Sequence, residues 1–262
     1  MVWRLEKGAA HSHLVGAAHF FPYRFRRGLR RLIGKARIVL LEGPLDEAAT
    51  RRVIAASRGA GGGALLAALD VPAKARLRAR LGLVDVPLDA QQFLKKLIFG
   101  GEAQWLEEEL RALRPWAAFF GIWARFRARQ GWDHHLDVDA ARIASALGRP
   151  VAYLETIDEQ LAALEAVPLA RFVHFLSAVD WQAYCAAYQR HYLAGDLPGL
   201  VAGAREFPTY CEPIIARRDP VLAARMAPEV ERGGACVVIG VAHCAGVLAQ
   251  LRDAGFHVTQ CS

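Results

Sequence analysis

The sequence predicts an α/β (α+β) fold, with a central mixed β-sheet that is built from both ends of the chain and flanked by helices. Two observations support this prediction. Short apolar, β-branched runs gather at the two ends of the chain and alternate mostly with helical patterns. Between residues 57 and 130 such runs are absent, and a glycine-rich stretch leads into amphipathic sequence. We therefore expect a single domain over residues 1–262, with a helical insertion at about residues 57–130.

Composition limits the classes of protein to which the chain can belong. Its 262 residues are 54% hydrophobic and 23% charged, which is enough to bury the core of one large or two small domains. The net charge of +7 would suit a polyanionic partner, but the basic residues are spread along the chain. No basic run is interleaved with aromatic residues, as a strand-binding groove would require. We expect no binding of nucleic acid.

The cysteines and the apolar runs indicate a reducing compartment and no membrane span. The five cysteines are odd in number and lack CxxC spacing, so neither a disulfide framework nor a zinc-thiolate site is expected. No secretory signal pattern is visible, which predicts a cytoplasmic location. The most apolar stretch, at 115–124, is far shorter than the roughly 20 residues of a transmembrane helix.

Six strands and several helices follow from the hydrophobic pattern. The strands are expected at 2–6, 13–18, 36–41, 150–155, 235–241 and 256–259. Amphipathic helices are expected at 90–97 and 102–113, a long helical tract with a core-forming aromatic stripe at 169–192, and a helix from near Pro220 that ends at Gly233 and Gly234. Four aromatic residues of the insertion are expected to line the wall of a ligand cleft and to select substrate: Trp116, Phe119, Phe120 and Trp123.

A short motif occurs near both ends of the chain. Residues 14–19 and 238–243 share the form apolar-apolar-Gly-x-Ala-His, with Gly16 before His19 and Gly240 before His243. Each glycine lies near the carboxyl end of a predicted strand, where a missing side chain lets a ligand or a neighbouring backbone approach closely. We expect the two strands to deliver their histidines by the same local geometry.

A carboxylate occupies a comparable place on a third strand. The apolar run at 37–41 ends in Glu42, which precedes Gly43 and Pro44. A buried carboxylate needs a cation or a hydrogen-bond donor beside it. Two imidazoles and one carboxylate are a common catalytic ligand set for a divalent metal. We therefore predict that the strands ending at His19, Glu42 and His243 are neighbours in one sheet and that these residues bind a metal; Zn, Mn and Co all fit.

Other residues have simpler interpretations. A single histidine after a strand is more often a hydrogen-bonded core or surface residue than a ligand, so the metal prediction depends on the repeated motif. His134 and His135 are adjacent and point in different directions, and no third ligand is expected near them. Cys244 follows His243 directly, which suggests a nucleophile, but sequence neighbours rarely form such a dyad. Cys244 is predicted to be a small wall residue.

Pieces along nearly the whole chain resemble the TraB/GumN family, which includes the Tiki proteins and is distantly related to the ChaN and erythromycin-esterase-like proteins. These pieces are Ser12-His-Leu-Val-Gly-Ala-Ala-His19, Val39-Leu-Leu-Glu42, Gly148-Arg-Pro-Val-Ala-Tyr-Leu-Glu-Thr156 with Glu159-Gln160, Arg218-Asp219 before Met226, and Gly240-Val-Ala-His243 followed by Gly246, Leu248, Leu251 and Gly255. The chain departs from the family at Ala17 and Ala18, where Thr-Ile or Thr-Ala is common, at Leu136, usually Gly, and at Asp219, usually Asn.

The resemblance implies a sheet-centred fold with a metal-dependent peptidase-like site. It makes His19 and His243 ligands and Glu42 a third ligand or the base that takes a proton from water. Arg218 is expected to hold a substrate carboxylate or an oxyanion, or to be an ordinary ion-paired arginine beside Asp219. Glu155 is expected to orient a ligand or to join the site as a second carboxylate, and Asp137 matches a family aspartate.

The predicted function is therefore that of a metal-dependent hydrolase, expected to be a peptidase, acting on a peptide or protein. Glu42, Glu155 and Arg218 are the expected catalytic residues, with Asp137, Gly16 and Gly240 in supporting places. Two alternatives remain open at this point. One is a protein of the same fold that binds a metal or haem without catalysis, and the other is a scaffold with a vestigial site. The sequence indicates no oligomeric state.

Overall fold

The structure is a computed structural model that describes residues 1–59, 61–82 and 110–261. Its internal contacts divide the chain into two compact units. Unit 1 comprises Met1–Arg52, Trp132–Val167 and Asp180–Ser262, and unit 2 comprises Val53–Gly131 and Pro168–Val179. The helical insertion expected at 57–130 falls within unit 2. That the chain forms a single domain stays a prediction.

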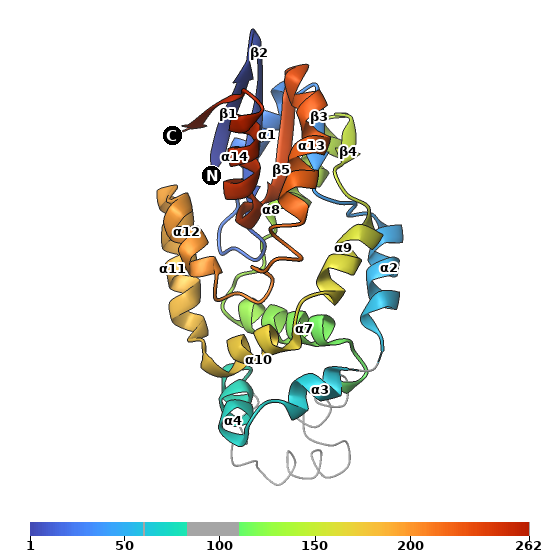
Figure 1. The fold of residues 1–262 in the computed structure, drawn as a ribbon, viewed down its shortest axis with the longest axis vertical. Coiled ribbons are helices and arrows are strands. Elements are labelled where there is room, and N and C mark those ends of the chain that lie inside the picture. Colours follow the sequence, from blue (N-terminus) through green and yellow to red (C-terminus); the bar gives the residue numbers. More distant parts are fainter. Residues whose placement is uncertain (60, 83–109, 262) are drawn as a thin grey trace. The chain divides into compact units, whose positions relative to one another are not determined.

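Unit 1 contains the mixed six-stranded sheet that the sequence predicts, with strand order β4-β3-β5-β2-β1-β6. Its strands are β1 (Val2–Lys7), β2 (Ala10–Ala17), β3 (Ile38–Leu41), β4 (Val151–Tyr153), β5 (Ala235–Gly240) and β6 (His257–Cys261). The first four in spatial order are parallel, whereas β1 is antiparallel to both β2 and β6. In Figure 1 strands from the two ends of the chain, blue and red, lie in one sheet. The predicted α/β class and the origin of the sheet from both chain ends are confirmed.

The apolar strands occupy the centre of this sheet. Every residue of β5 is buried, and Val39, Leu40 and Leu41 of β3 are at most 2% exposed. Such continuous apolar runs are typical of parallel strands with both faces covered. β5 pairs with β3 on one side and with β2 on the other. The predicted adjacency of the strands that precede His19, Glu42 and His243 is therefore confirmed.

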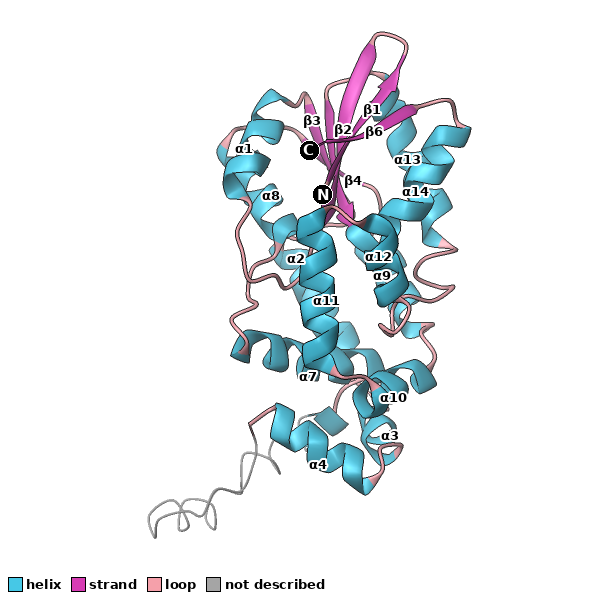
Figure 2. Cartoon of the chain, turned by 90° about the vertical axis from the view of Figure 1, so that its left-hand side faces the viewer, coloured by secondary structure: helices cyan, strands magenta, loops and turns pink. Residues whose placement is uncertain are grey.

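Helices cover both faces of the sheet. Figure 2 shows α1 (Arg26–Lys35) and α8 (Leu136–Ala146) on one side, and α13 (Arg218–Glu231) and α14 (Cys244–Asp253) on the other. Helix α13 ends before Gly233 and Gly234, both with positive φ, as predicted. The other described helices of unit 1 are α9 (Ile157–Glu165), α11 (Trp181–Ala194), α12 (Leu197–Ala204) and the 3-10 turn η1 (Val241–His243). Helix α2 (Glu47–Ser57) runs across the unit boundary at residues 52 and 53.

The described part of unit 2 is helical. Its helices are α3 (Gly62–Ala67), α4 (Val71–Arg80), α7 (Pro115–Arg129) and α10 (Leu169–Ala178). The helix expected at 90–97, and all but the end of the one expected at 102–113, lie outside the described residues. No single helix of the described chain is both long and apolar enough to cross a membrane; the neighbouring α9 and α10 meet that condition only when taken together.

Two expectations about helices are wrong. The tract at 169–192 is two helices, because Val179 is extended and the Asp180 side chain accepts hydrogen bonds from the first amides of α11. The aromatic residues of α7 were expected to line a cleft, yet Phe119 is 0% and Trp123 4% exposed. The Phe119 ring lies 5.1 Å from that of Phe172 on α10, within unit 2. These aromatic side chains form core instead of a cleft wall.

Candidate metal centre

Three side chains meet at the carboxyl ends of the adjacent strands β2, β3 and β5. His19 lies two residues after β2, Glu42 directly after β3, and His243 three residues after β5. Their atoms surround Gly240: a methyl group added there would lie 3.2 Å from Glu42 Oε2, 3.4 Å from His19 Nε2 and 3.5 Å from His243 Cδ2. His243 Nε2 is 3.8 Å from Glu42 Oε1. The two motif histidines and the glutamate therefore face one place.

The two histidines arrive there by different backbone routes, so the expectation of one shared local geometry is wrong. β5 stops at Gly240, and His243 ends the 3-10 turn η1 that continues directly into α14. His19 lies in an irregular bend, and the next residue, Phe20, has a φ of 58°. A left-handed conformation is costly for a bulky side chain and marks a segment that its surroundings constrain. A motif shared in sequence is thus followed by two different turns.

The buried His243 ring is held by a carboxylate. Its Nδ1 lies 2.7 Å from Asp219 Oδ1, and both side chains are almost fully buried. Burial raises the pKa of Asp219, although the contact with His243 opposes that shift. If Nδ1 carries the proton and donates it to Asp219, Nε2 keeps its lone pair on the side of Glu42. A carboxylate behind a metal-binding histidine commonly has this role.

His19 has a similar partner. Its Nδ1 lies 3.4 Å from Asp137 Oδ2, in the first turn of α8, while Nε2 points toward Gly240. The negative charge of Asp137 raises the pKa of His19 to about 9. The His19 side chain is 49% exposed, in contrast to 5% for His243. The site therefore combines one buried and one accessible imidazole.

Glu42 is fixed through both carboxylate oxygens. Oε1 accepts a hydrogen bond of 2.5 Å from Arg218 Nη2, and Oε2 accepts one of 2.8 Å from the amide of Gly240. Burial alone would raise the pKa of Glu42, but the charges of His243, Arg218 and His19 outweigh it and hold the pKa at about 2. Glu42 is therefore ionised and held in one orientation.

Arg218 is an ion-paired arginine that joins two carboxylates. Besides Glu42 it binds the buried Glu155, with Nε 2.9 Å from Oε1 and Nη2 2.5 Å from Oε2. The amide of Glu155 donates to the carbonyl oxygen of Glu42, because pairing between the two strands continues past β4. The sequence left open whether Arg218 holds a substrate group or is an ion-paired arginine. These contacts favour an ion-paired arginine, which positions Glu42.

The predicted glycines have different surroundings. Gly240 borders the three candidate ligands, whereas a methyl group at Gly16 would lie 3.0 Å from both Cys244 Sγ and Val241 Cγ2. Gly16 therefore makes room for packed side chains. Cys244 is fully buried, and burial raises the pKa of its thiol far above the usual range, which favours the wall residue over the nucleophile.

A cleft with a volume of about 220 Å³ opens over these residues. Its lining includes His19, Glu42, Asp137 and Arg218 together with apolar side chains such as Leu45 and Leu164. Gln160 of α9 also lines it, and a methyl group at Gly43 would lie only 2.5 Å from the Gln160 amide. Gln160 is not among the residues predicted for the site, although it belongs to the Glu-Gln pair in the resemblance.

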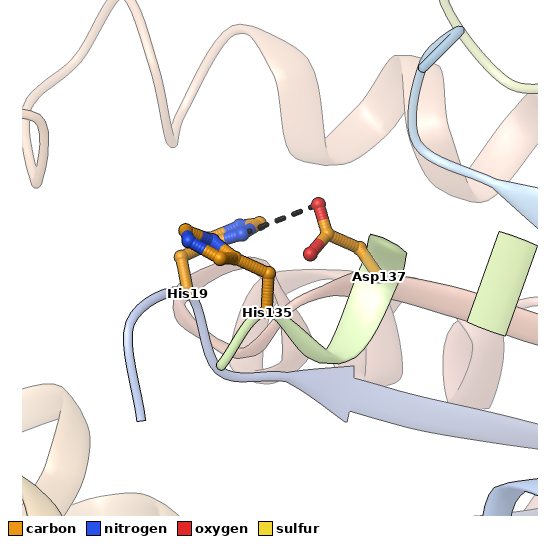
Figure 3. A group of neighbouring side chains, drawn as sticks. All are labelled: His19, His135 and Asp137. Carbon is orange, nitrogen blue, oxygen red and sulfur yellow. Dashed lines mark ion pairs between the residues drawn. The ribbon is translucent and has the colours of Figure 1, made fainter. Parts of the chain in front are cut away.

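His135 was also missed. Ligand atoms of His19, His135 and Asp137 all lie within 4.8 Å of one another, and Figure 3 shows the Asp137 carboxylate facing the His19 ring. The expectation that no third ligand lies near His135 is wrong. Its i, i+2 spacing to Asp137 was the available signal, but His19 comes from a distant part of the sequence.

The donor set around Gly240 suits a divalent cation. Both motif histidines direct Nδ1 to an aspartate; Nε2 of His19 faces Gly240 and Nε2 of His243 faces Glu42, each of whose oxygens has a further lone pair. Gly240 leaves free the space that a side chain would fill. Four carboxylates, those of Glu42, Asp137, Glu155 and Asp219, contact Arg218 or one of the two histidines, so a cation that replaces the proton of His19 would offset negative charge.

Comparisons with known proteins agree with the sequence resemblance. Searches of curated proteins and of solved structures found no match. The model of the TraB/PrgY/gumN family matches residues 1–260, which include His19, Glu42, Gly240 and His243 and all of the sheet except the last residue of β6. On this match, which spans almost the entire sequence, the chain belongs to the TraB/PrgY/gumN family.

Proposed function

We propose that this chain is a metal-dependent hydrolase that cleaves peptide bonds, with a divalent ion held by His19, Glu42 and His243. The observation that carries the proposal is the convergence of His19 Nε2, Glu42 Oε2 and the His243 ring around Gly240. These groups follow the ends of three neighbouring strands. Two imidazoles and one carboxylate leave coordination positions open for water and substrate.

Such an ion, when bound, lowers the pKa of water toward neutrality and polarises a carbonyl group. The protein residues around it have distinct tasks. Asp219 and Asp137 accept from Nδ1 of the two histidines and so direct each Nε2 into the site. Arg218 and the Gly240 amide hold the Glu42 carboxylate in place.

The electrostatics of Glu42 support the role of ligand over that of base. A carboxylate with a pKa of about 2 accepts a proton poorly near pH 7, whereas an ionised carboxylate is a good metal ligand. Glu155 is 3% exposed at its side chain and bound to Arg218, which supports a structural task for it rather than proton transfer to a leaving group.

The cleft supports a small substrate segment instead of a large cofactor. A volume of about 220 Å³ is below the roughly 300–1,000 Å³ of pockets that enclose drug-sized ligands. Apolar Leu45 and Leu164 beside the amide of Gln160 suit an extended peptide, which carries side chains and backbone hydrogen-bonding groups. The haem-binding alternative has no comparable support.

The test is elemental analysis combined with a peptide hydrolysis assay on the same preparation. The wild-type chain is expected to retain Zn, Mn or Co and to hydrolyse a peptide library, and the His19→Ala/His243→Ala variant is expected to lose both. The matched control is His11→Ala/His13→Ala, which removes two histidines of β2 outside the site. Hydrolysis that persists after exhaustive chelation, or in the site variant, would show that the chemistry lies elsewhere.

A further inference from the structure

The face of His19 that points away from Gly240 lies in a second group of possible ligands. Among the described residues, His19, His135 and Asp137 are the one set of three His, Cys, Asp or Glu whose ligand atoms all lie within 4.8 Å of one another. Like the first group, this set has two imidazoles and one carboxylate. It shares only His19 with that group.

Backbone pairing brings these residues together. The amides of Phe21 and His134 each donate to the carbonyl oxygen of the other residue, and the amide of Leu136 donates to Ala18. These bonds tie the segment around His19 to the start of α8 on both sides of the two imidazoles. The Phe20 ring also packs on His135, with ring centroids 4.5 Å apart.

One of the two carboxylate oxygens of Asp137 is available to a ligand. Oδ2 faces His19 Nδ1, whereas Oδ1 is buried and has no hydrogen-bond partner. A buried carboxylate oxygen without a partner is costly, and a cation would satisfy it. The two carboxylates that are not shared are about equally exposed, Asp137 at 21% and Glu42 at 20%, but His135 is half-buried whereas His243 is only 5% exposed.

We propose that His19, His135 and Asp137 form a second, outer position for a divalent cation. This inference goes beyond the proposed hydrolase, because binding at the outer position requires no catalysis. We call the position at His19, Glu42 and His243 the inner position.

The tautomer of His19 makes the two positions alternatives. A neutral imidazole has one nitrogen with a free lone pair. With the proton on Nδ1, His19 donates to Asp137 and offers Nε2 to the inner position. With the proton on Nε2, it offers Nδ1 to a cation that Asp137 and His135 also bind. One cation per chain is therefore expected, and the more exposed outer position is where it would first meet the protein.

Titration with Co²⁺, followed by its visible absorption, tests the outer position in backgrounds that lack the inner one. The Glu42→Gln/His243→Ala variant is expected to bind about one Co²⁺ per chain. Adding His135→Ala or, more conservatively, Asp137→Asn should weaken that binding by at least about tenfold, by analogy with losses seen when the surroundings of a metal are altered. The matched control adds His134→Ala, which removes the neighbouring histidine and should leave Co²⁺ binding unchanged.

The proposal is overturned if the Glu42→Gln/His243→Ala variant, folded by circular dichroism, binds no Co²⁺, or if its binding survives both His135→Ala and Asp137→Asn. Should that variant fail to fold, the single His243→Ala variant provides the same comparison, with Glu42 kept. These readouts concern binding only. The proposed hydrolase fails on a different result, namely wild-type hydrolysis that is indifferent to chelation.

Discussion

Glu42 is the residue in which the opposing electrostatic effects of this site meet. Burial disfavours its charge, but Arg218, the Gly240 amide and two histidines surround it. The Glu155–Arg218 pair extends this network into the interior. A substitution at Glu42 therefore changes both the charge of the site and the hydrogen bonds of its neighbours.

Replacing Glu42 by Gln is expected to lower metal affinity by about 10–100-fold, together with hydrolysis, because the amide keeps the shape but brings no negative charge to a cation. Metal content and turnover should be measured on one preparation. If metal stays bound while turnover falls by about 10²–10⁴-fold, Glu42 is the base instead. Full hydrolysis by the metal-replete variant would contradict both roles.

The Gly240→Ala substitution is expected to affect metal binding without disturbing the fold. The backbone of Gly240, with φ −52° and ψ 131°, is accessible to alanine, but the methyl group would lie 3.2–3.5 Å from all three candidate ligands. Crowding of about 1–3 kcal/mol in the metal-bound state would weaken affinity by at least about fivefold. Isothermal titration with the metal checks this. Gly203→Ala, which meets open space on α12, is the control and should not alter affinity.

At the level of elements, the strands were readable from the sequence because each is a short apolar run between clear breaks. All six expected runs overlap the strands in the structure. The position of His243 just after an apolar run correctly placed it at the carboxyl end of β5. The outer group was not readable. His135 and Asp137 approach His19 only through pairing between residues 18–21 and 134–136, a contact that no local pattern encodes.

The turns after the two motif strands were predicted wrongly, because the shared motif suggested one geometry for both. Gly-x-x-His is followed by a 3-10 turn and helix in one case and by an irregular bend in the other, and the packing of each segment decides which forms. The sequence marked Asp219 as a departure from the family and as a neighbour of Arg218, but not as a partner of His243. Its contact with His243 joins α13 to the turn before α14, so the aspartate at this position holds the His243 ring.

Gly246→Ala tests this helix contact without touching a ligand. A methyl group there would lie 1.9 Å from Asp219 Oδ2, so the Asp219 carboxylate must move away from α14. We expect a loss of stability of about 1–3 kcal/mol and weaker metal binding, because His243 loses its fixed partner. Urea unfolding and a metal titration measure the two effects. Unchanged affinity in the destabilised variant would show that Asp219 does not orient His243.

At the level of the whole molecule, a bound cation should stabilise the sheet of unit 1, since its inner ligands follow three neighbouring strands. Saturation at about 100 times the dissociation constant contributes about 2.7 kcal/mol. The Tm of the unfolding transition should therefore rise by several degrees with added Co²⁺ or Zn²⁺. Differential scanning calorimetry checks this, and the shift should vanish in His19→Ala/His243→Ala. A shift that remains there would indicate cation binding elsewhere.

The central place of β5 also determines when the sheet can form during synthesis of the chain. β2 and β3 emerge early from the ribosome, but they do not pair with each other, because β5 lies between them. More than half of the chain is translated before residues 235–243 appear, so the nascent protein holds two strands without their shared neighbour. The inner ligands cannot assemble during that interval. The proposed inner position can therefore form only after residue 243 has been synthesised.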